Sequence, residues 1–273
     1  MTVTEPETTA RGGTEQVLSL AGINKRFGAV QALTDVSLDV YAGEVVALVG
    51  DNGAGKSTLV KTIAGVYHPD SGTISIGGRP VTITTPSAAQ QLGIATVFQD
   101  LALCDNLDVV ANLFLGKEHH LGPLMNEVSM EKEAWRLLRS LSAKIPSVRI
   151  PVASLSGGQR QTVAIARSLV GAPRVVMLDE PTAALGVAQT AEVLNLVERL
   201  RENGLGVILV SHNMADVQAV SDRIVVLRLG RNTAEFWTEE ATTDQLVAAI
   251  TGASDNVVAQ RAARRVPGRE GDQ

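Results

Sequence analysis

Cysteine and aromatic residues are scarce in this chain of 273 residues. Cys104 is its one cysteine, which excludes an intramolecular disulfide and any metal site built from several cysteines. Aromatic residues make up 3% of the chain and the formal net charge is −5. Neither stacking rings nor an overall basic charge is present, so the composition predicts no nucleic-acid partner. The arginines at 261, 264, 265 and 269 are a local exception, which we interpret as part of a solvated tail.

Long apolar runs are also missing. The longest stretches, such as 45–49 and 224–227, fall far short of the roughly 20 residues that cross a bilayer. Residues 1–13 lack the basic start and apolar stretch of a signal peptide, so we expect a soluble protein that stays in the cytoplasm. With 45% hydrophobic residues, the chain can bury the core of one large α/β domain.

Short apolar segments predict strands in the first part of the chain. Residues 17–20 and 36–40 alternate like half-buried strands and are separated by turn-prone residues at 25–28, which predicts an antiparallel β-lobe. Residues 44–49 form a continuous apolar run, as expected for a buried parallel strand. Residues 57–65 then have the pattern of a helix.

The pattern becomes helical from about residue 101 to residue 165. Ser129 is a plausible N-cap, followed by one apolar face that contains Ala134, Leu137, Leu138 and Leu141. Strand, helix and strand return at 174–178, 188–202 and 207–210. This alternation predicts a parallel sheet with helices on its faces, and a helical lobe inserted into it.

The loop after the strand at 44–49 has the spacing of a phosphate-binding loop (P-loop). Its glycines let backbone N–H groups converge on phosphate oxygens at the start of a helix. Lys56 is expected to reach the β- and γ-phosphates, and Ser57 to bind Mg²⁺. The predicted nucleotide-binding residues of this loop are Gly50, Asp51, Asn52, Gly53, Ala54, Gly55, Lys56, Ser57 and Thr58.

Two carboxylates follow the strand at 174–178. Asp179 is positioned to approach Mg²⁺, often through a water, and Glu180 to orient or deprotonate the attacking water. The alternative is a buried strand that ends in two acidic residues by chance.

A second glycine-rich segment, Leu155-Ser156-Gly157-Gly158-Gln159, comes about a hundred residues after the P-loop. Ser156 can cap a helix whose first backbone N–H groups are exposed by the two glycines. Such a helix start can bind a second anion, although it can equally be a capped helix without a ligand.

The P-loop, the Leu-Ser-Gly-Gly-Gln segment and the run Val-Val-Met-Leu-Asp-Glu-Pro-Thr at 175–182 together resemble ATP-binding cassette (ABC) ATPases. The resemblance extends from about Val17 to Gly252 and implies an α/β P-loop fold with a parallel sheet, an antiparallel β-lobe and an inserted helical lobe at about 101–165. The predicted domains are a disordered lead (1–15), a single ABC ATPase domain (16–252) and a flexible tail (253–273).

The resemblance implies further site residues. Phe27 is similar to the aromatic residue that stacks on adenine, although it can also be a core residue of the β-lobe. Gln99 resembles the Q-loop glutamine that contacts Mg²⁺ or the water, and His212 the switch histidine that contacts the γ-phosphate. Ser156, Gly157, Gly158 and Gln159 correspond to the signature segment, which binds the ATP held by a second subunit.

One segment departs from the family pattern. Many members carry Ser-Ala-Leu-Asp after Pro-Thr, whereas this chain has Ala183-Ala184-Leu185-Gly186. Gly186 is either a tolerated variant or a backbone hinge, and its effect on communication between two ATP sites is open. This segment, together with the P-loop region and residues 105–116, is similar to the ATPases of bacterial ribose, xylose and fructose importers.

The resemblance therefore implies a Mg²⁺-dependent ATPase that energises monosaccharide uptake from the cytoplasmic face of the membrane. We expect permease subunits as partners, an extracytoplasmic solute-binding protein as an indirect one, and a dimer with a second copy or a paralogue, since no second cassette is present. Two alternatives are a regulatory or ribosome-associated ABC ATPase and a monomeric P-loop kinase or GTPase.

Overall fold

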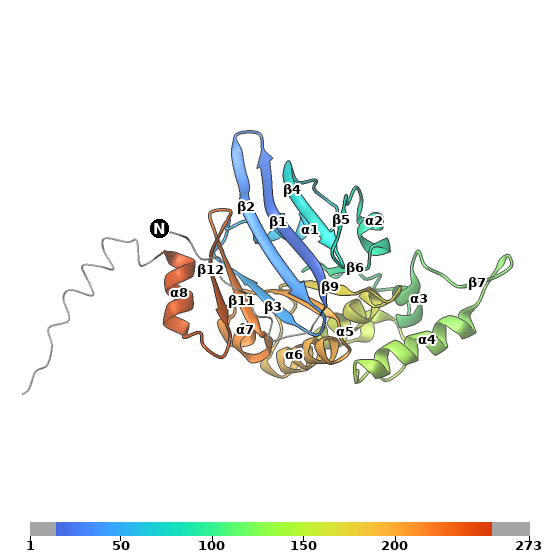
Figure 1. The fold of residues 1–273 in the computed structure, drawn as a ribbon. Helices are drawn as coiled ribbons and strands as arrows, with labels where there is room; N and C mark the ends of the chain where they lie inside the picture. The colour runs from blue at the N-terminus through green and yellow to red at the C-terminus, as the bar shows by residue number, and fades with distance from the viewer. Residues whose placement is uncertain (1–14, 253–273) are drawn as a thin grey trace, which may run out of the picture.

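A central six-stranded sheet organises the computed structural model, which describes residues 15–252 (Figure 1). The predicted lead and tail lie outside the described residues, apart from Glu15. In spatial order the strands are β12 (Arg231–Trp237), β11 (Arg223–Arg228), β3 (Val45–Val49), β10 (Gly206–Val210), β9 (Val175–Asp179) and β6 (Ile94–Val97). All neighbours pair in parallel except β12, which pairs antiparallel with β11 at the edge.

The inner strands are buried along their length because helices or the second sheet cover both faces. All five residues of β3 and of β10 are buried, which agrees with their continuous apolar sequences. The helices that flank or extend this sheet are α1 (Lys56–Ile63), α2 (Pro86–Gln91), α5 (Gly157–Ser168), α6 (Val187–Glu202), α7 (Met214–Val220) and α8 (Thr243–Thr251).

A four-stranded sheet, the β-lobe, lies over the central sheet (Figure 1). Its order is β2 (Val30–Tyr41), β1 (Gln16–Phe27), β4 (Ser71–Ile76) and β5 (Arg79–Val81), all antiparallel. The turn predicted at 25–28 is wrong in its bounds, because β1 continues to Phe27 and pairs it with Val30. Gly28, with φ 57°, takes the left-handed conformation that this tight turn requires.

Between β6 and α5 lie α3 (Val109–Phe114), the hairpin β7 (His120–Leu121) and β8 (Leu124–Met125), α4 (Glu127–Ser140) and a 3-10 turn (Val152–Ser154). This helical lobe extends from one end of the central sheet (Figure 1). The predicted N-cap of α4 is wrong. Asn126 caps the helix and its Oδ1 accepts a hydrogen bond from the Ser129 amide at 3.1 Å. The hairpin ends at Met125, directly before Asn126, and the helix therefore begins at Glu127.

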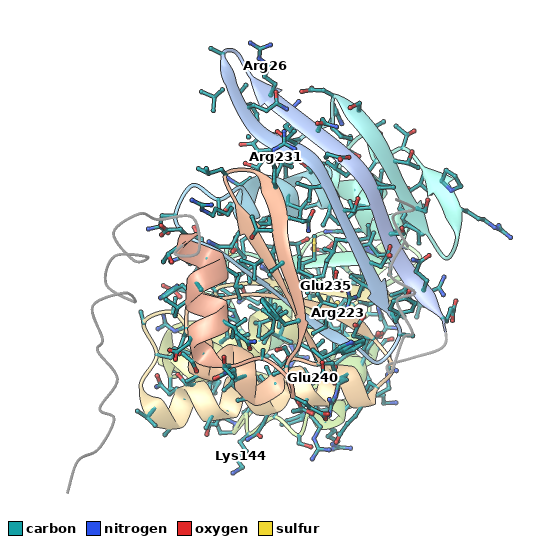
Figure 2. The ribbon with its side chains drawn as sticks, turned by 60° about the vertical axis from the view of Figure 1, so that its left-hand side comes forward. Arg26, Lys144, Arg223, Arg231, Glu235 and Glu240 are labelled. Carbon is teal, nitrogen blue, oxygen red and sulfur yellow. The ribbon has the colours of Figure 1, made fainter. Side chains whose placement is uncertain are left out.

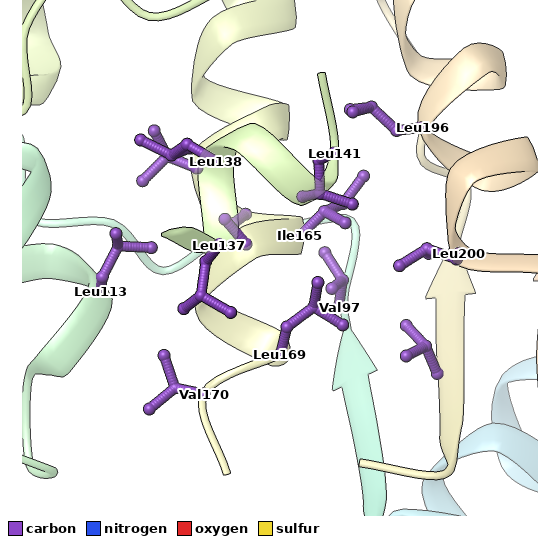
Figure 3. Close-up of a cluster of buried hydrophobic side chains, with 14 of the residues drawn as sticks. Val97, Leu113, Leu137, Leu138, Leu141, Ile165, Leu169, Val170, Leu196 and Leu200 are labelled. Carbon is purple, nitrogen blue, oxygen red and sulfur yellow. The ribbon is translucent and has the colours of Figure 1, made fainter. Parts of the chain in front are cut away.

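One hydrophobic cluster joins the helical lobe to the central sheet. The predicted apolar face of α4 is buried in it, together with side chains of α3, α5, α6 and β6 (Figure 3). The labelled members are Val97, Leu113, Leu137, Leu138, Leu141, Ile165, Leu169, Val170, Leu196 and Leu200. A second cluster fills the space between the sheet and the β-lobe. Because α5 packs in the first cluster, its N-terminus is held at a fixed place relative to the sheet.

A buried ion pair ties the edge of the central sheet to the β-lobe. Arg223, at the start of β11, donates to Glu44 with Nε at 2.8 Å from Oε1, and to the backbone oxygen of Asp39 at 2.6 Å. Its third partner is Glu235 on β12, and the two side chains lie together in Figure 2. Arg223 and Glu44 are both almost fully buried. Within residues 15–252, no helix is both long and apolar enough to cross a membrane.

Candidate nucleotide-binding site

The P-loop and the three predicted catalytic residues follow the carboxyl ends of four neighbouring parallel strands. Gly50 follows β3, His212 lies two residues after β10, Glu180 follows β9, and Gln99 lies two residues after β6. These strands are adjacent in the order β3, β10, β9, β6. Segments that are far apart in the sequence therefore meet at one edge of the sheet, where α/β folds commonly bind ligands.

The P-loop connects β3 to α1 through backbone that only glycine fits. Gly50 has φ 149°, and a Cβ placed on it would lie 2.1 Å from the carbonyl oxygen of Leu227. Lys56 is buried, and its Nζ donates to the carbonyl oxygens of Gly50 at 2.6 Å and Asp51 at 3.1 Å. The ammonium group is thus held inside the curve of the loop. Burial lowers the pKa of Lys56, and the charges of Glu180 and Asp51 offset this in part.

A carboxylate and an imidazole meet beside the loop. Oε2 of Glu180 lies 2.7 Å from Nδ1 of His212, whose side chain is 73% exposed, compared with 17% for Glu180. Glu180 has φ 52°, which is uncommon for a residue with a side chain, and its amide donates to the Val210 carbonyl at 2.9 Å. The bond to β10 fixes the turn that aims this carboxylate toward His212.

Asp179 ends β9 and is partly buried. Burial raises the pKa of Asp179, and the charge of Glu180 raises it further. Asp179, Ser57 and Gln99 bring a carboxylate, a hydroxyl and an amide oxygen to the same edge of the sheet. Such oxygen donors suit Mg²⁺, so the residues present fit this ion.

Sequence reasoning missed a contact that joins the loops after β9 and β10. Thr182 donates from Oγ1 to Oδ2 of Asp216 at 2.7 Å. Asp216 is 6% exposed and lies in the first turn of α7, just after His212. The bond couples the position of the Glu180 loop to that of the histidine loop. No sequence signal indicates it, because the two residues are 34 positions apart.

Phe27 lies at the end of β1 and is 40% exposed, which excludes the alternative of a core residue in the β-lobe. Its ring contacts Tyr67 edge-on, with ring centroids 5.0 Å apart. Nζ of Lys25 lies 5.4 Å from the Phe27 centroid and is paired with Asp70 at 3.0 Å. Tyr67 and Lys25 thus fix the ring and leave part of it open for a stacking partner. Tyr67 was also missed, because it contacts Phe27 only through the fold.

The signature segment caps α5. The Gln159 amide donates to Oγ of Ser156 at 3.3 Å, and the Ser156 amide donates to Oε1 of Gln159 at 3.0 Å. Ser156 and Gly157 remain exposed, whereas Gly158 packs so that an added Cβ would lie 3.2 Å from Cβ of Gln189. In the described part of the chain, no hydrogen bond or ion pair joins this segment to the P-loop. The P-loop and the signature segment are therefore two separate helix starts on this chain.

Residues 183–186, which depart from the family pattern, lead into α6. Gly186 is the N-cap of this helix in extended backbone, and its amide donates to Oε1 of Gln189 at 3.4 Å. Ala184 has φ 60°, and Val187, the first residue of α6, is 92% exposed. The segment is thus a surface loop that packs beside the signature segment, with Leu185 close to Gly157.

Comparison with known proteins agrees with this geometry. Residues 33–183 match the model of the ABC transporter family. The chain is 42% identical to the xylose/arabinose import ATP-binding protein XylG of Sulfolobus acidocaldarius, over 86% of this chain and 94% of that protein. It is also 42% identical to the fructose import ATP-binding protein FrcA of Rhizobium meliloti, over 88% of this chain and 96% of that protein.

A solved structure supports the fold. A dimeric ATP-binding cassette in a post-hydrolysis state, bound to ADP and phosphate, aligns with a TM-score of 0.68 at 26% identity, covering 81% of this chain and 98% of the other. The predicted α/β cassette fold and the predicted resemblance are both confirmed. The chain belongs to the ABC transporter family, the ATP-binding cassette proteins.

Proposed function

We propose that this chain binds and hydrolyses ATP as the nucleotide-binding subunit of a monosaccharide importer, acting through separate membrane permease subunits. The main support for ATPase activity is the position of the Glu180–His212 pair beside the P-loop. Oε2 of Glu180 and Nδ1 of His212 are 2.7 Å apart. The names of the xylose/arabinose and fructose import relatives support a sugar as the transported solute.

The P-loop is the part that binds the nucleotide. Backbone N–H groups of 50–58 and the N-terminus of α1 would contact the phosphates. Lys56 would exchange its two carbonyl contacts for phosphate oxygens, which are better partners for a buried ammonium. Phe27 would stack on the adenine, a contact worth roughly 1–3 kcal/mol by analogy with other base–aromatic stacks.

Hydrolysis requires a base next to the γ-phosphate. Glu180 would accept a proton from the attacking water while the new P–O bond forms and the bond to the ADP oxygen breaks. His212, beside the same carboxylate, would hold the γ-phosphate and keep Glu180 oriented. The turn at Glu180 supports this role, because its hydrogen bond to β10 fixes the base relative to the histidine.

Ser57, Asp179 and Gln99 would hold Mg²⁺. Bound there, the ion would neutralise charge on the β- and γ-phosphate oxygens. Among residues 15–252, no three His, Cys, Asp or Glu side chains converge into a metal site of their own. The remaining ligands would accordingly come from the nucleotide and water, as is usual for Mg²⁺.

The ATP-binding site would be completed by a second subunit. Ser156, Gly157 and Gly158 expose a helix start that is separate from the P-loop of the same chain. Two copies, or one copy and a paralogue, would pack head to tail so that each signature segment contacts the ATP on the partner's Lys56. The dimeric cassette with bound ADP and phosphate supports this arrangement.

The permease would bind the groove between β6 and the helical lobe. The groove has a volume of about 950 Å³ and includes Phe98 and Asp100, the neighbours of Gln99. A protein seated there would respond to movement of Gln99 when the γ-phosphate is lost. This contact would hold the chain peripherally at the cytoplasmic face of the membrane, where a solute-binding protein would act on the permease from the other side.

The test is Glu180→Gln, which removes the base but preserves the shape of the side chain. We expect ATP hydrolysis to fall by roughly 10²–10⁴-fold, while ATP-dependent dimerisation in a sedimentation assay persists. Glu239→Gln, the same change at an exposed glutamate that the proposal places in no binding role, is the matched control and should leave the rate unchanged. Normal ATP hydrolysis by Glu180→Gln would show that Glu180 is not the base. Copurification with permease subunits distinguishes an importer from a regulatory ABC ATPase, and ATP-dependent dimerisation distinguishes it from a monomeric kinase or GTPase.

A further inference from the structure

Glu180 and His212 lie on two loops that turn sharply just after neighbouring strands. The turn at 180–185 begins with Glu180 at φ 52° and contains Ala184 at φ 60°. Within it, the amide of Ala183 donates to the Glu180 carbonyl at 3.1 Å. Residues with side chains stay in the left-handed region only where surrounding contacts hold them there. The position of the Glu180 carboxylate therefore depends on the contacts that anchor this turn.

Hydrogen bonds to β10 and to α7 anchor the turn. The amide of Glu180 donates to the carbonyl of Val210, the last residue of β10. A side chain makes the bond to α7, in which Oγ1 of Thr182 donates to Oδ2 of Asp216 at 2.7 Å. Thr182 lies two residues after Glu180, so this second bond holds the part of the turn that leads away from the strand.

Asp216 is a firm acceptor because it is buried on a packed helix. Its side chain belongs to a residue that is only 6% exposed, and the next residue, Val217, is fully buried in a hydrophobic cluster. Within residues 15–252, no lysine, arginine or histidine forms an ion pair with Asp216. A buried carboxylate without a counter-charge needs hydrogen-bond donors. Thr182 supplies such a donor.

The helix that carries Asp216 begins directly after the histidine loop. Ser211 is 1% exposed, and its Oγ accepts the Asn213 amide at 3.1 Å. Asn213 caps α7, with its Oδ1 accepting the Ala215 amide at 3.0 Å. His212 lies between Ser211 and Asn213, so its backbone is fixed relative to the first turn of α7.

We propose that Thr182 and Asp216 are a positioning pair for ATP hydrolysis, whose hydrogen bond keeps the Glu180 carboxylate beside His212. The inference rests on the proposed function, because it takes Glu180 to be the base. A base that is displaced by about 1 Å loses much of its effect on the reaction, whereas the P-loop still binds the nucleotide. The pair therefore acts on kcat and leaves KM unchanged.

Steady-state ATP hydrolysis by the purified full chain tests the proposal. Thr182→Val replaces the hydroxyl with a methyl group of similar size, and we expect kcat to fall by roughly 10–100-fold with little change in KM. Thr182→Ser keeps the donor and should retain most of the parent rate. A folded Thr182→Val variant with the parent's kcat, or a Thr182→Ser variant as slow as Thr182→Val, would overturn the proposal.

Thr251→Val is the matched control. Thr251 is an exposed residue of α8 whose Oγ1 donates to the Val247 carbonyl at 2.7 Å. The control thus makes the same chemical change and also removes a hydroxyl hydrogen bond, but in a helix that carries no predicted site residue. It should leave kcat and KM unchanged.

A double variant separates positioning from folding. Thr182→Val leaves the Asp216 carboxylate buried without this donor, which lowers the stability of the fold. Adding Asp216→Leu, a side chain of similar shape, removes that charge, so the melting temperature should recover while kcat stays low. Recovery of kcat together with the melting temperature would mean that the pair serves only the fold, and it would overturn the proposal.

A double-mutant cycle shows whether the pair acts through Glu180. The base is absent in Glu180→Gln, so adding Thr182→Val should change the residual single-turnover rate by less than about twofold. An equal fractional loss of rate in the parent and in Glu180→Gln would overturn the proposal, because the pair would then act on another group. A parent chain that hydrolyses no ATP would instead refute the proposed function, and with it the role of Glu180 on which this pair depends.

Discussion

Among single residues, Asp179 and Glu180 show how this fold gives two adjacent carboxylates different environments. Asp179 is the last residue of β9, whereas Glu180 directly after it has φ 52° and its carboxylate lies beside His212. Burial and the charge of Glu180 raise the pKa of Asp179. The charges of Lys61 and Lys56 offset this rise only in part. The ionised form of Asp179 is therefore costly in the folded state, and we expect this residue to lower the stability of the fold.

We therefore expect Asp179→Asn to stabilise the protein when nucleotide and Mg²⁺ are absent. A raised folded-state pKa means that the folded state binds the proton more tightly than the unfolded state does. Stability is thus lost as the pH rises from the unfolded-state pKa through the folded-state pKa, and the full cost is present at neutral pH. Removing the buried carboxylate in Asp179→Asn should raise the free energy of unfolding at pH 7 by roughly 0.5–2 kcal/mol.

Urea unfolding at several pH values measures this difference. The gap between Asp179→Asn and the parent should shrink as the pH falls through the window between the two pKa values. The exposed Glu239→Gln changes an acid to an amide far from Asp179 in the sequence and should shift stability by less than about 0.5 kcal/mol. An Asp179→Asn variant that is less stable than the parent at pH 7 would contradict the argument.

At the level of elements, the sequence predicted the strands and helices that carry the site, because their patterns are local. The buried run at 45–49, the Ser156 cap and the apolar face of α4 all follow from spacing within one element. Contacts between elements were not predictable in this way. Tyr67 against Phe27, Thr182 with Asp216, and Arg167 on the Leu101 carbonyl depend on how distant segments pack.

The buried ion pair between Arg223 and Glu44, which connects the central sheet to the β-lobe, is such a contact. Arg223→Met would leave Glu44 buried without its cation, which costs roughly 3–5 kcal/mol of unfolding free energy. Adding Glu44→Leu should recover part of this loss, because the second change removes the stranded charge. Chemical denaturation of the single and double variants measures both steps. If the double variant were less stable than Arg223→Met, the uncompensated carboxylate of Glu44 would not be the cause of the lost unfolding free energy.

For the whole molecule, the separation of the P-loop from the signature segment predicts complementation between inactive variants, if each ATP site is shared between two chains as proposed. Lys56→Ala disables the P-loop. Ser156→Glu places a charge that repels phosphate on the signature segment, at a helix start where an acidic residue is tolerated. Each variant alone should be inactive, because both sites of its homodimer contain the lesion. In a mixed dimer, the P-loop of the Ser156→Glu chain faces the intact signature segment of the Lys56→Ala chain.

Random mixing of equal amounts makes about half of the dimers mixed, and each of these has one intact site of two. The ATPase rate should then reach about a quarter of the parent rate if the sites act independently. Phosphate release from the 1:1 mixture, compared with each variant alone, measures it. Recovery well below a quarter would mean that the two sites must act together, a coupling in which the loop at Gly186 is a candidate element. Activity of either variant alone, in dimers that sedimentation detects, would contradict the shared site, because both sites of such a homodimer contain the lesion.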